Sequence, residues 1–418
     1  MTSRFPGRSA LAAMLAVALI APSAASQAPT KPVSLPGSYD GGYLVFQSAD
    51  SAFKYWLDGR MQIDAAVYNG SKNGLSSGTE VRRARLGVKT TLFTDWHAEM
   101  DLDFAFNAIE IKDMWVAYAG FPNKFIRIGN FKEPFSLETL TSSKNITFME
   151  RSYADNFSPD RNIGASLTQW GNRWEYSVGL FGQTAGEVDV SARPEGYGFT
   201  GRFSFLPVKS DANLLHLGFG ASQRTPDAGA PADANQVRFR GRPETDVSLA
   251  RFVTTGKIKN VRLTNYWNGE LAYMHGRTLL QAEYTGVNVH RLAALKTAGF
   301  SGGYVALSQL LTDDKRDYLV ADGEFDRIQP KGKRGAWELA ARVSVIDLND
   351  PTAGVAIAGG RATNVTLGVN WYINTNFKWM FNYVRVMNDD NAKPDIGIAP
   401  FQTGDSFNIL QTRFALAF

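Results

Sequence analysis

The sequence predicts an all-β fold, a transmembrane antiparallel β-barrel of about 16 strands, on three observations. Polar and apolar residues alternate with a period of two through most of the chain. Many of these segments are longer than the roughly 5 or 6 residues of ordinary strands and suit the roughly 9 to 11 that a tilted transmembrane strand needs. The N-terminus carries the pattern of a secretory signal. Together these features favour a membrane barrel over a soluble β-sandwich or propeller.

The predicted signal is compact. Arg4 and Arg8 precede the apolar run 10–21, and small residues follow it. A basic start, an apolar stretch and an A-x-A-like site are the parts of a secretory signal, and the apolar run is shorter than the roughly 20 residues of a membrane-spanning helix. The chain is therefore expected to divide into a cleaved signal peptide, 1–28, an N-terminal linker or periplasmic segment, 29–52, and a barrel, 53–418.

The segment Phe53–Tyr68 shows the strand pattern most clearly. Its odd positions are mostly apolar, as at Phe53 and Leu57, and its even positions are mostly polar, as at Asp58 and Arg60. Because successive side chains of a strand point to opposite faces, one face of this strand suits lipid and the other a watery lumen. The same reasoning predicts strands at 53–68, 81–92, 97–104, 111–119, 124–131, 164–170, 173–181, 197–206, 214–223, 262–275, 278–289, 299–311, 336–348, 363–372, 377–387 and 406–418.

The strand ends strengthen the membrane interpretation. Trp96, Trp170 and Trp174 lie where predicted strands meet turns, as in the aromatic girdles of membrane barrels. The last strand alternates up to a terminal Phe418. This ending resembles the signal by which bacterial outer-membrane barrels are recognised for insertion.

The composition excludes several other classes of protein. The chain has no cysteine, so it has neither disulfides nor thiolate metal sites. It holds 44 basic and 40 acidic residues, and removing Arg4 and Arg8 with the signal leaves an excess of about two positive charges. Any preference for anions must therefore come from where the charges lie. Nucleic acid is not expected as a partner in this compartment.

A long loop, Asn130–Ile163, interrupts the alternating pattern and has strands on both sides. It mixes basic residues, Lys132, Lys144 and Arg151 among them, with several phenylalanines. Loops of this length usually have a function. We expect it to fold into the lumen as the third extracellular loop and to set the bore, with a mobile outer loop as the alternative.

The strand 81–92 places Arg83, Arg85 and Lys89 on its polar side and Arg82 on its lipid side. An arginine at the bilayer midplane costs about 2 to 4 kcal/mol. Arg82 is therefore expected at a strand end, at a bulge or in a subunit interface.

A second long loop, 224–260, contains Arg238, Arg240 and Arg242 at every second position. In extended backbone the three guanidinium groups share one side and could pass an oxyanion between successive bidentate contacts. The alternative is a basic outer surface that binds the phosphates of lipopolysaccharide. A third long connection, 312–335, is a charged connector.

The residues do not favour catalysis, a cofactor or a metal. The four histidines, His97, His216, His275 and His290, are scattered without ligand spacing. The carboxylates of 99, 101 and 103 share a strand face and could be read as a Ca²⁺ site. We expect them instead to pair with inward arginines across the lumen.

Four segments together resemble the phosphate-selective porins O and P. They are VRRARLGVKTTLFTDWHAEMDLDF, EIKDMWVAYAGF, FIRIGNFKEPFSLETLTSSKNITFMERS and GVNWYINTNFKWMFNYV. The resemblance implies a trimer of 16-stranded barrels in the outer membrane, in contact with its lipid and lipopolysaccharide. It also implies passive diffusion of anions, with phosphate or pyrophosphate as the permeants. An arginine ladder would lead them in, a constriction would follow, and lysines would guide the exit.

Residue by residue, the resemblance places the anion constriction at Arg82, Arg83, Arg151, Asp113 and Lys144. Asp113 matches the single acid that faces the arginines, and Lys144 a loop lysine near the exit. The outer ladder would be Arg238, Arg240 and Arg242.

The chain departs from the family pattern at three positions. Thr139 stands where lysine is common, Lys132 where an uncharged residue is expected, and Arg85 adds a third inward arginine. Arg85 and Lys132 are therefore candidate modifiers of specificity. The alternative function is a general porin, or one for organic anions or sugars, without a preference for phosphate.

Overall fold

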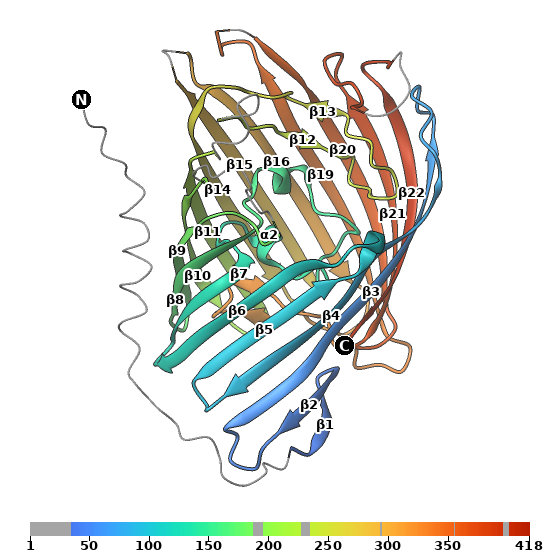
Figure 1. The fold of residues 1–418 in the computed structure, drawn as a ribbon. Coiled ribbons are helices and arrows are strands. Elements are labelled where there is room, and N and C mark those ends of the chain that lie inside the picture. Colours follow the sequence, from blue (N-terminus) through green and yellow to red (C-terminus); the bar gives the residue numbers. More distant parts are fainter. Residues whose placement is uncertain (1–34, 187–194, 227–234, 293–294, 355, 396–400) are drawn as a thin grey trace, which may run out of the picture.

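The computed structural model describes residues 35–186, 195–226, 235–292, 295–354, 356–395 and 401–418. They form a closed barrel of 16 antiparallel strands, which confirms the predicted fold class (Figure 1). The predicted signal peptide lies outside the described residues. The strands of the wall are β3 (Phe53–Asn69), β4 (Gly78–Leu92), β5 (Trp96–Asp103), β6 (Glu110–Phe121), β7 (Lys124–Lys132), β8 (Arg161–Trp170), β9 (Trp174–Phe181), β10 (Gly198–Lys209), β11 (Asn213–Arg224), β14 (Val261–His275), β15 (Thr278–Arg291), β16 (Ala298–Leu310), β19 (Ala336–Asp350), β20 (Ile357–Tyr372), β21 (Phe377–Asn388) and β22 (Ser406–Ala417).

The barrel closes where its last strand meets its first. β22 pairs with β3 in antiparallel register, with Arg413 opposite Asp64. The backbone of Phe418 continues this ladder by exchanging two hydrogen bonds with Gly59, of 2.7 and 3.0 Å. The Phe418 ring lies over the same glycine, where a Cβ would come within 2.3 Å of it. Closure leaves no free strand edge in the wall.

Burial along the wall strands is the reverse of that in a soluble protein. On β19, Leu339 and Val343 are 46% and 47% exposed, whereas Glu338 and Arg342 are 0% and 3% exposed. The apolar residues face outward and the charged ones face the lumen, as a lipid surround requires. Aromatic pairs such as Trp337 with Trp371 lie where these strands meet the turns, as the sequence predicted.

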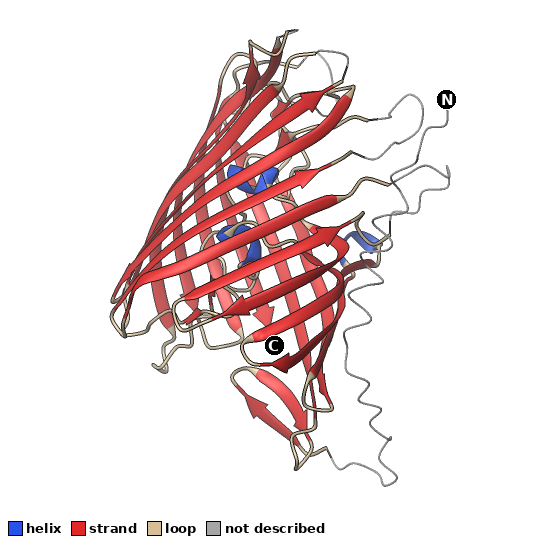
Figure 2. Ribbon diagram, turned by 90° about the vertical axis from the view of Figure 1, so that its left-hand side faces the viewer, coloured by secondary structure: helices blue, strands red, loops and turns tan. Residues whose placement is uncertain are grey.

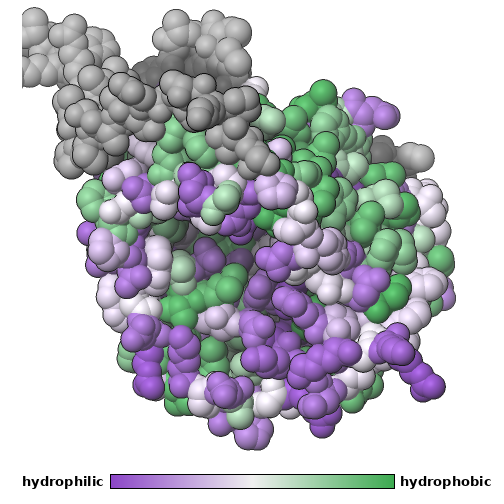
Figure 3. Space-filling model, turned by 90° about the horizontal axis from the view of Figure 1, so that it is seen from below, coloured by the Kyte–Doolittle hydropathy of each residue, from purple (hydrophilic) through white to green (hydrophobic). Residues whose placement is uncertain are grey.

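The two ends of the barrel differ. Most connections at one end, the turn end, are short, whereas the other end, the loop end, carries the long loops (Figure 2). The exception at the turn end is the connection 311–335, which contains the two-residue strands β17 (Tyr318–Leu319) and β18 (Glu324–Phe325). Part of the expected linker also forms a hairpin below the barrel, β1 (Gly37–Asp40) with β2 (Tyr43–Gln47), and β2 pairs with β3. Seen from this end, hydrophilic residues gather around a central hollow (Figure 3).

The third loop, residues 133–160, folds into the lumen as expected, and we call it the infolded loop. It contains the short helices α2 (Leu137–Leu140) and η2 (Tyr153–Phe157), each begun by a serine side chain that accepts a backbone N–H. A further 3-10 turn, η1 (Ala105–Asn107), lies between β5 and β6. Among the described residues, no helix is long and apolar enough to cross a membrane.

Candidate functional site

The infolded loop crosses the lumen because the opposite wall satisfies its backbone groups. The Glu138 N–H donates to Glu283 on β15 at 2.7 Å, and the Met149 N–H donates to Asn382 on β21 at 2.9 Å. A glycine on β11 makes room for the loop, since a Cβ at Gly220 would come within 2.0 Å of the Phe135 carbonyl. Further bonds from wall side chains reach the loop at Thr147, Ile146, Glu150 and Tyr153.

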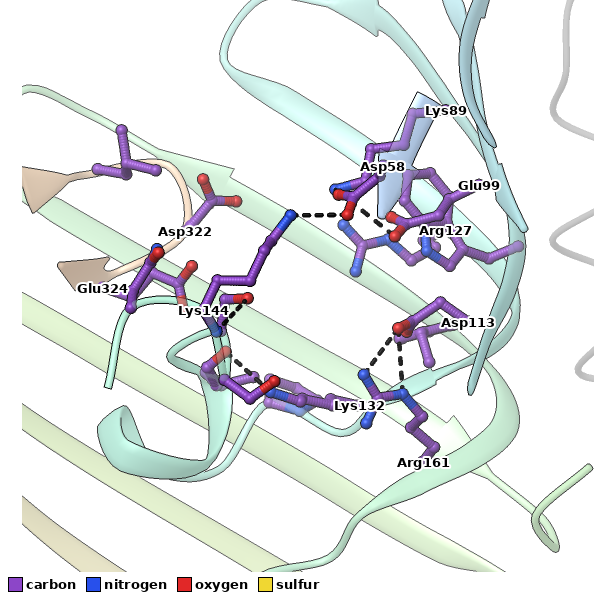
Figure 4. A pocket seen from close by; sticks show the side chains of 18 of the residues that line it. Asp58, Lys89, Glu99, Asp113, Arg127, Lys132, Lys144, Arg161, Asp322 and Glu324 are labelled. Atoms are coloured by element: carbon purple, nitrogen blue, oxygen red, sulfur yellow. Dashed lines mark hydrogen bonds and ion pairs between the residues drawn. The ribbon is translucent and has the colours of Figure 1, made fainter. Parts of the chain in front are cut away.

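Between this loop, the β3–β9 wall and the 311–335 connection lies a cavity of about 360 Å³ (Figure 4). We call it the lumen cavity. Nine basic and seven acidic side chains line it: Arg60, Arg83, Arg85, Lys89, Arg127, Lys132, Lys144, Arg151 and Arg161, with Asp58, Glu99, Asp113, Glu175, Asp322, Glu324 and Asp326. The excess of positive charge is small, so the local pairing of each group decides what it offers a solute.

A β-bulge explains how Arg82 and its neighbour both face inward. Gln62 pairs with Arg83 and Ile63 with Val81, so Arg82 is the extra residue between them. A bulge adds one residue to a strand and re-aims its side chain. The sequence predicted Arg82 at a strand end, at a bulge or in a subunit interface, and the structure places it at a bulge.

The paired arginines meet an acid of the infolded loop. Arg82 donates to Glu150 at 2.9 and 3.0 Å, and the Arg83 guanidinium lies 4.0 Å from the same carboxylate. Arg413 also reaches it. Burial alone would raise the pKa of Glu150, but the three guanidiniums hold that pKa well below its usual range. Arg82 does not line the cavity, whereas Arg83 does.

The loop residues named by the sequence line the cavity. Arg151 donates to the carbonyls of Glu138 and Thr141 at 2.8 and 2.7 Å and lies 3.8 Å from Asp155. Lys144 donates to Asp58 at 2.6 Å. Burial lowers the pKa of Lys144 to about 7, although Asp58 raises it. Near neutral pH, Lys144 is therefore only partly protonated.

Lys132 and Arg127 are cations without an ion pair in the described part of the chain. Lys132, at the end of β7, donates to the carbonyls of Thr139 and Leu140. The Arg127 guanidinium lies 4.3 Å from the centre of the Trp115 ring and also contacts Phe125 and Phe131. Carbonyls and rings orient these groups without placing a carboxylate beside them, so both groups can contact an anionic solute in the cavity.

The expected acid, Asp113, has a different partner from the one the resemblance implied. It accepts hydrogen bonds from Arg161 at 2.7 and 3.1 Å (Figure 4). It therefore neutralises Arg161 and does not contact the paired arginines. Nor is it the single acid of the site, since six others line the cavity.

The acids of β5 lie close to basic residues of the neighbouring strand. Asp103 lies 2.7 Å from Arg85, Asp101 lies 3.6 Å from Arg85, and Glu99 lies 3.5 Å from Lys89. The sequence predicted such pairing with inward basic residues, but placed it across the lumen. The structure instead has it between the neighbouring strands β4 and β5, where Arg85 stands opposite Asp103 and Lys89 opposite Glu99. Oxygens of residues 99, 101 and 113 come within 4.8 Å of one another, but guanidinium and ammonium groups surround them.

The outer arginines lie on the loop between β11 and β14. Its short strands β12 (Arg240–Gly241) and β13 (Val253–Thr254) pair, and Arg238 and Arg240 alternate with buried Phe239 and Gly241. Arg238 and Arg240 lie 3.1 and 3.6 Å from Asp395, and Arg242 contacts Asp246. All three are outside the lumen cavity.

Comparison with known proteins agrees with this architecture. The family model for phosphate-selective porin O and P matches residues 56–418. The chain belongs to this family. Porin O of Pseudomonas aeruginosa is 28% identical over 418 residues, which is 91% of this chain and 93% of that one. An uncharacterized protein of Caulobacter vibrioides is 32% identical over 388 residues, 86% of this chain and 73% of that one.

Solved porin structures share the fold. An anion-selective porin from Comamonas acidovorans superposes with a TM-score of 0.56 at 15% identity, covering 88% of this chain and 100% of that one. OmpT of Vibrio cholerae gives 0.55 at 11% identity, with 88% and 98% covered. The porin O and P chain is therefore a barrel of the bacterial outer membrane. Its loop end is extracellular and its turn end periplasmic.

Two groups of this porin's cavity residues were not singled out from the sequence. Arg60, Arg127 and Arg161 line it on the wall, and the inward parity of Arg60 and Arg127 on their strands was a usable signal. Asp322, Glu324 and Asp326 line it from the periplasmic connection, where no alternating pattern marked them. The resemblance implied lysines toward the exit, but acids lie there beside Lys144.

Proposed function

We propose that this porin allows passive diffusion of anions across the outer membrane, with phosphate or polyphosphate as the preferred permeants. Two relationships support this: membership of a family named for phosphate selectivity, and a shared fold with the anion-selective porin of Comamonas acidovorans. The arrangement of charges in the lumen cavity supports it as well.

The observation that carries the proposal is that Arg127, Lys132 and Arg151 line one cavity while aromatic rings or carbonyls, not bidentate carboxylates, hold them. At an effective dielectric constant of about 20, a pair of unit charges 4 Å apart gains roughly 4 kcal/mol before desolvation is subtracted. Contacts of this size attract a partly dehydrated oxyanion. Conduction also requires release, which the acids of the cavity promote.

The remaining predicted residues fit a route through the pore. Arg238, Arg240 and Arg242 would collect anions at the extracellular mouth. Arg82 and Arg83 would hold the infolded loop through Glu150, with Arg83 also facing the solute. Asp113 would limit binding by neutralising Arg161. Arg85, paired with Asp103, would act on specificity less than Lys132.

The assembly belongs to the same proposal. Residues 1–28 would direct the chain to the cell envelope as a cleaved signal. Three copies would form the working channel, in contact with outer-membrane lipid and lipopolysaccharide. OmpT of Vibrio cholerae, which shares the fold, has been solved in a trimer form.

Single-channel recording in chloride, with phosphate, pyrophosphate and sulfate titrated in, tests this function. We expect the wild-type channel to be anion-selective and to be blocked by phosphate. Arg83→Ala and Arg151→Ala should weaken the block, whereas Arg277→Ala, in an exposed turn, should not. Selectivity that survived both cavity changes would overturn the site assignment.

The alternative is a general porin, or one for organic anions or sugars. The near balance of nine basic and seven acidic residues in the cavity favours it. Chloride conductance that added phosphate leaves unchanged would support this alternative. Lipid hydrolysis by the purified barrel would instead indicate an enzyme, and absence of any conductance a structural role.

A further inference from the structure

The periplasmic connection 311–335 is built into the lumen. The Tyr318 hydroxyl and His216 Nδ1 on β11 are 2.7 Å apart, and Arg202 on β10 donates to the Gly323 carbonyl at 2.9 Å. Phe325 packs in an apolar cluster with Leu137 of the infolded loop. These contacts fix the tip of the connection against the wall and the infolded loop.

The tip presents Asp322, Glu324 and Asp326 to the lumen cavity. In the described part of the chain, none of the three forms an ion pair. Asp326 accepts a hydrogen bond from Asn145 at 3.4 Å and one from the backbone N–H of Arg327. By contrast Asp317, on the solvent side of the same connection, pairs with Lys315 at 3.2 Å.

Basic groups face these acids across the cavity. In Figure 4, Asp322 and Glu324 lie at one side, Arg127 and Arg161 at the other, and Lys144 between them. The basic side also has unfilled hydrogen-bonding capacity. Arg60 and Arg83 are 8% and 5% exposed, and the Nε atom of each has no hydrogen-bond partner in the described structure. Both residues line the cavity, so an anion there meets guanidinium groups whose hydrogen bonds within the protein are incomplete.

The acidic side has basic neighbours, Arg127 near Asp322 and Lys132 near Glu324, but no direct ion pair with them among the described residues, and the unfavourable effects on the acids are larger. Burial first, and then the neighbouring Asp322, raise the pKa of Glu324 to about 8. Burial also raises the pKa of Asp322. Like charges held close together disfavour each other, and a protonated amine placed among them stabilises them.

We propose that the 311–335 connection is a second selectivity element, and that the cavity prefers small anions that also carry a protonated amine, such as aminoalkyl phosphates. The anionic group lies toward Lys132, Arg151 and Arg127, and the ammonium group toward Asp322, Glu324 and Asp326. The cavity of about 360 Å³ is at the small end of the range of ligand sites. The site proposed for the phosphate group of the ligand rests on the proposed function. The site proposed for its ammonium group does not follow from that function.

The test compares O-phosphoethanolamine with ethyl phosphate, which lacks the amine, as blockers of chloride current through the full-length channel in a planar bilayer. We expect phosphoethanolamine to half-block at an about tenfold lower concentration, the effect of one charge-assisted hydrogen bond. The combined change Asp322→Asn, Glu324→Gln and Asp326→Asn should remove this difference. The block by ethyl phosphate should persist or become tighter, because the change removes negative charge from the cavity.

Two controls make the outcome decisive. Asp317→Asn, on the same connection but outside the cavity, should preserve the difference. Asp322→Asn alone, at a side chain that is accessible from the lumen cavity, should reduce it if the triple variant fails to fold. Equal block by the two compounds in the wild type would overturn the inference while leaving the phosphate porin intact. A difference that persisted in the triple variant would overturn the placement. A cation-selective wild-type channel would overturn the proposed function instead.

Discussion

The two walls of the lumen use the same residue types in different ways. On the β10–β22 wall, Arg202, Arg342 and Arg413 are at most 3% exposed, and each forms close ion pairs with acids. On the cavity side some cations are paired in the same way, as Arg161 is with Asp113. Lys132 and Arg151 differ, because carbonyls make their close contacts and the nearest carboxylate to Arg151 is 3.8 Å away. A buried arginine with close carboxylate partners holds loops in place. A cation without a close carboxylate partner can still attract an anionic solute. The partner of a basic residue, and not its presence in the lumen, therefore indicates its role.

The largest effect is expected on the paired wall. Arg342 donates to Glu138 of the infolded loop at 3.1 Å and to Glu244 of the outer loop at 2.6 Å. Arg342→Met leaves both buried carboxylates without this partner, which costs about 3 to 5 kcal/mol. Urea unfolding of the refolded barrel in detergent measures this loss. Arg151→Met is the matched change, and it should cost only about 1 kcal/mol because it mainly removes hydrogen bonds to carbonyls. Equal losses for the two variants would remove the distinction between the walls.

On the cavity side, Lys132→Gln should change binding rather than stability. Its ammonium group bonds only carbonyls, so the glutamine amide can keep those bonds while the charge is lost. We expect the phosphate concentration for half-block of chloride current to rise about tenfold, since a charge-assisted hydrogen bond is lost. Lys209→Gln, at the periplasmic rim, serves as the charge-matched control. An unchanged block would show that Lys132 is not part of the anion site.

A smaller effect is expected from freeing a neutralised cation. Asp113→Asn removes the close carboxylate partner of Arg161 and leaves it only the longer contact with the exposed Asp160. Phosphate should then bind several-fold more tightly and leave more slowly, which lowers the conductance at saturating phosphate. Asp160→Asn is the control, because Asp160 contacts the same arginine at 3.4 Å but its side chain is exposed. If the Asp113 variant kept the wild-type block and conductance, its proposed role in release would be wrong.

The wall was predictable because its signal is local. The alternation in Phe53–Tyr68 is a property of one strand, and each predicted strand overlaps an observed one. Arg82 shows the limit of such patterns, because a bulge shifts parity by one residue and only the pairing with β3 reveals it. The position of the 311–335 connection in the lumen could not be predicted from the sequence, for another reason. Its docking depends on contacts such as Tyr318 with His216, far apart in the chain, and on acids that follow no periodic pattern.

The smallest expected effect is a pH dependence of ion selectivity. It should come from titrating residues of the lumen cavity and not from the paired arginines of the opposite wall. The pKa of Lys144 is lowered to about 7, and that of Glu324 is raised to about 8. As the pH rises from about 6 to 9, Lys144 loses its positive charge and Glu324 gains a negative one. Both changes make the cavity less positive, so the ratio of chloride to potassium permeability should fall across this window.

Two variants separate the contributions, and reversal potentials in a salt gradient measure them. Lys144 faces Tyr43, Asp58, Arg60 and Lys89. Lys144→Arg keeps its charge at every pH tested and should leave only the step near 8. Glu324→Gln should leave only the step near 7. Paired wall arginines such as Arg413 keep their charge throughout this window, so they contribute no step of their own. A pH profile that both variants left unchanged would place the titrating groups outside the cavity and would weaken the distinction between the two walls.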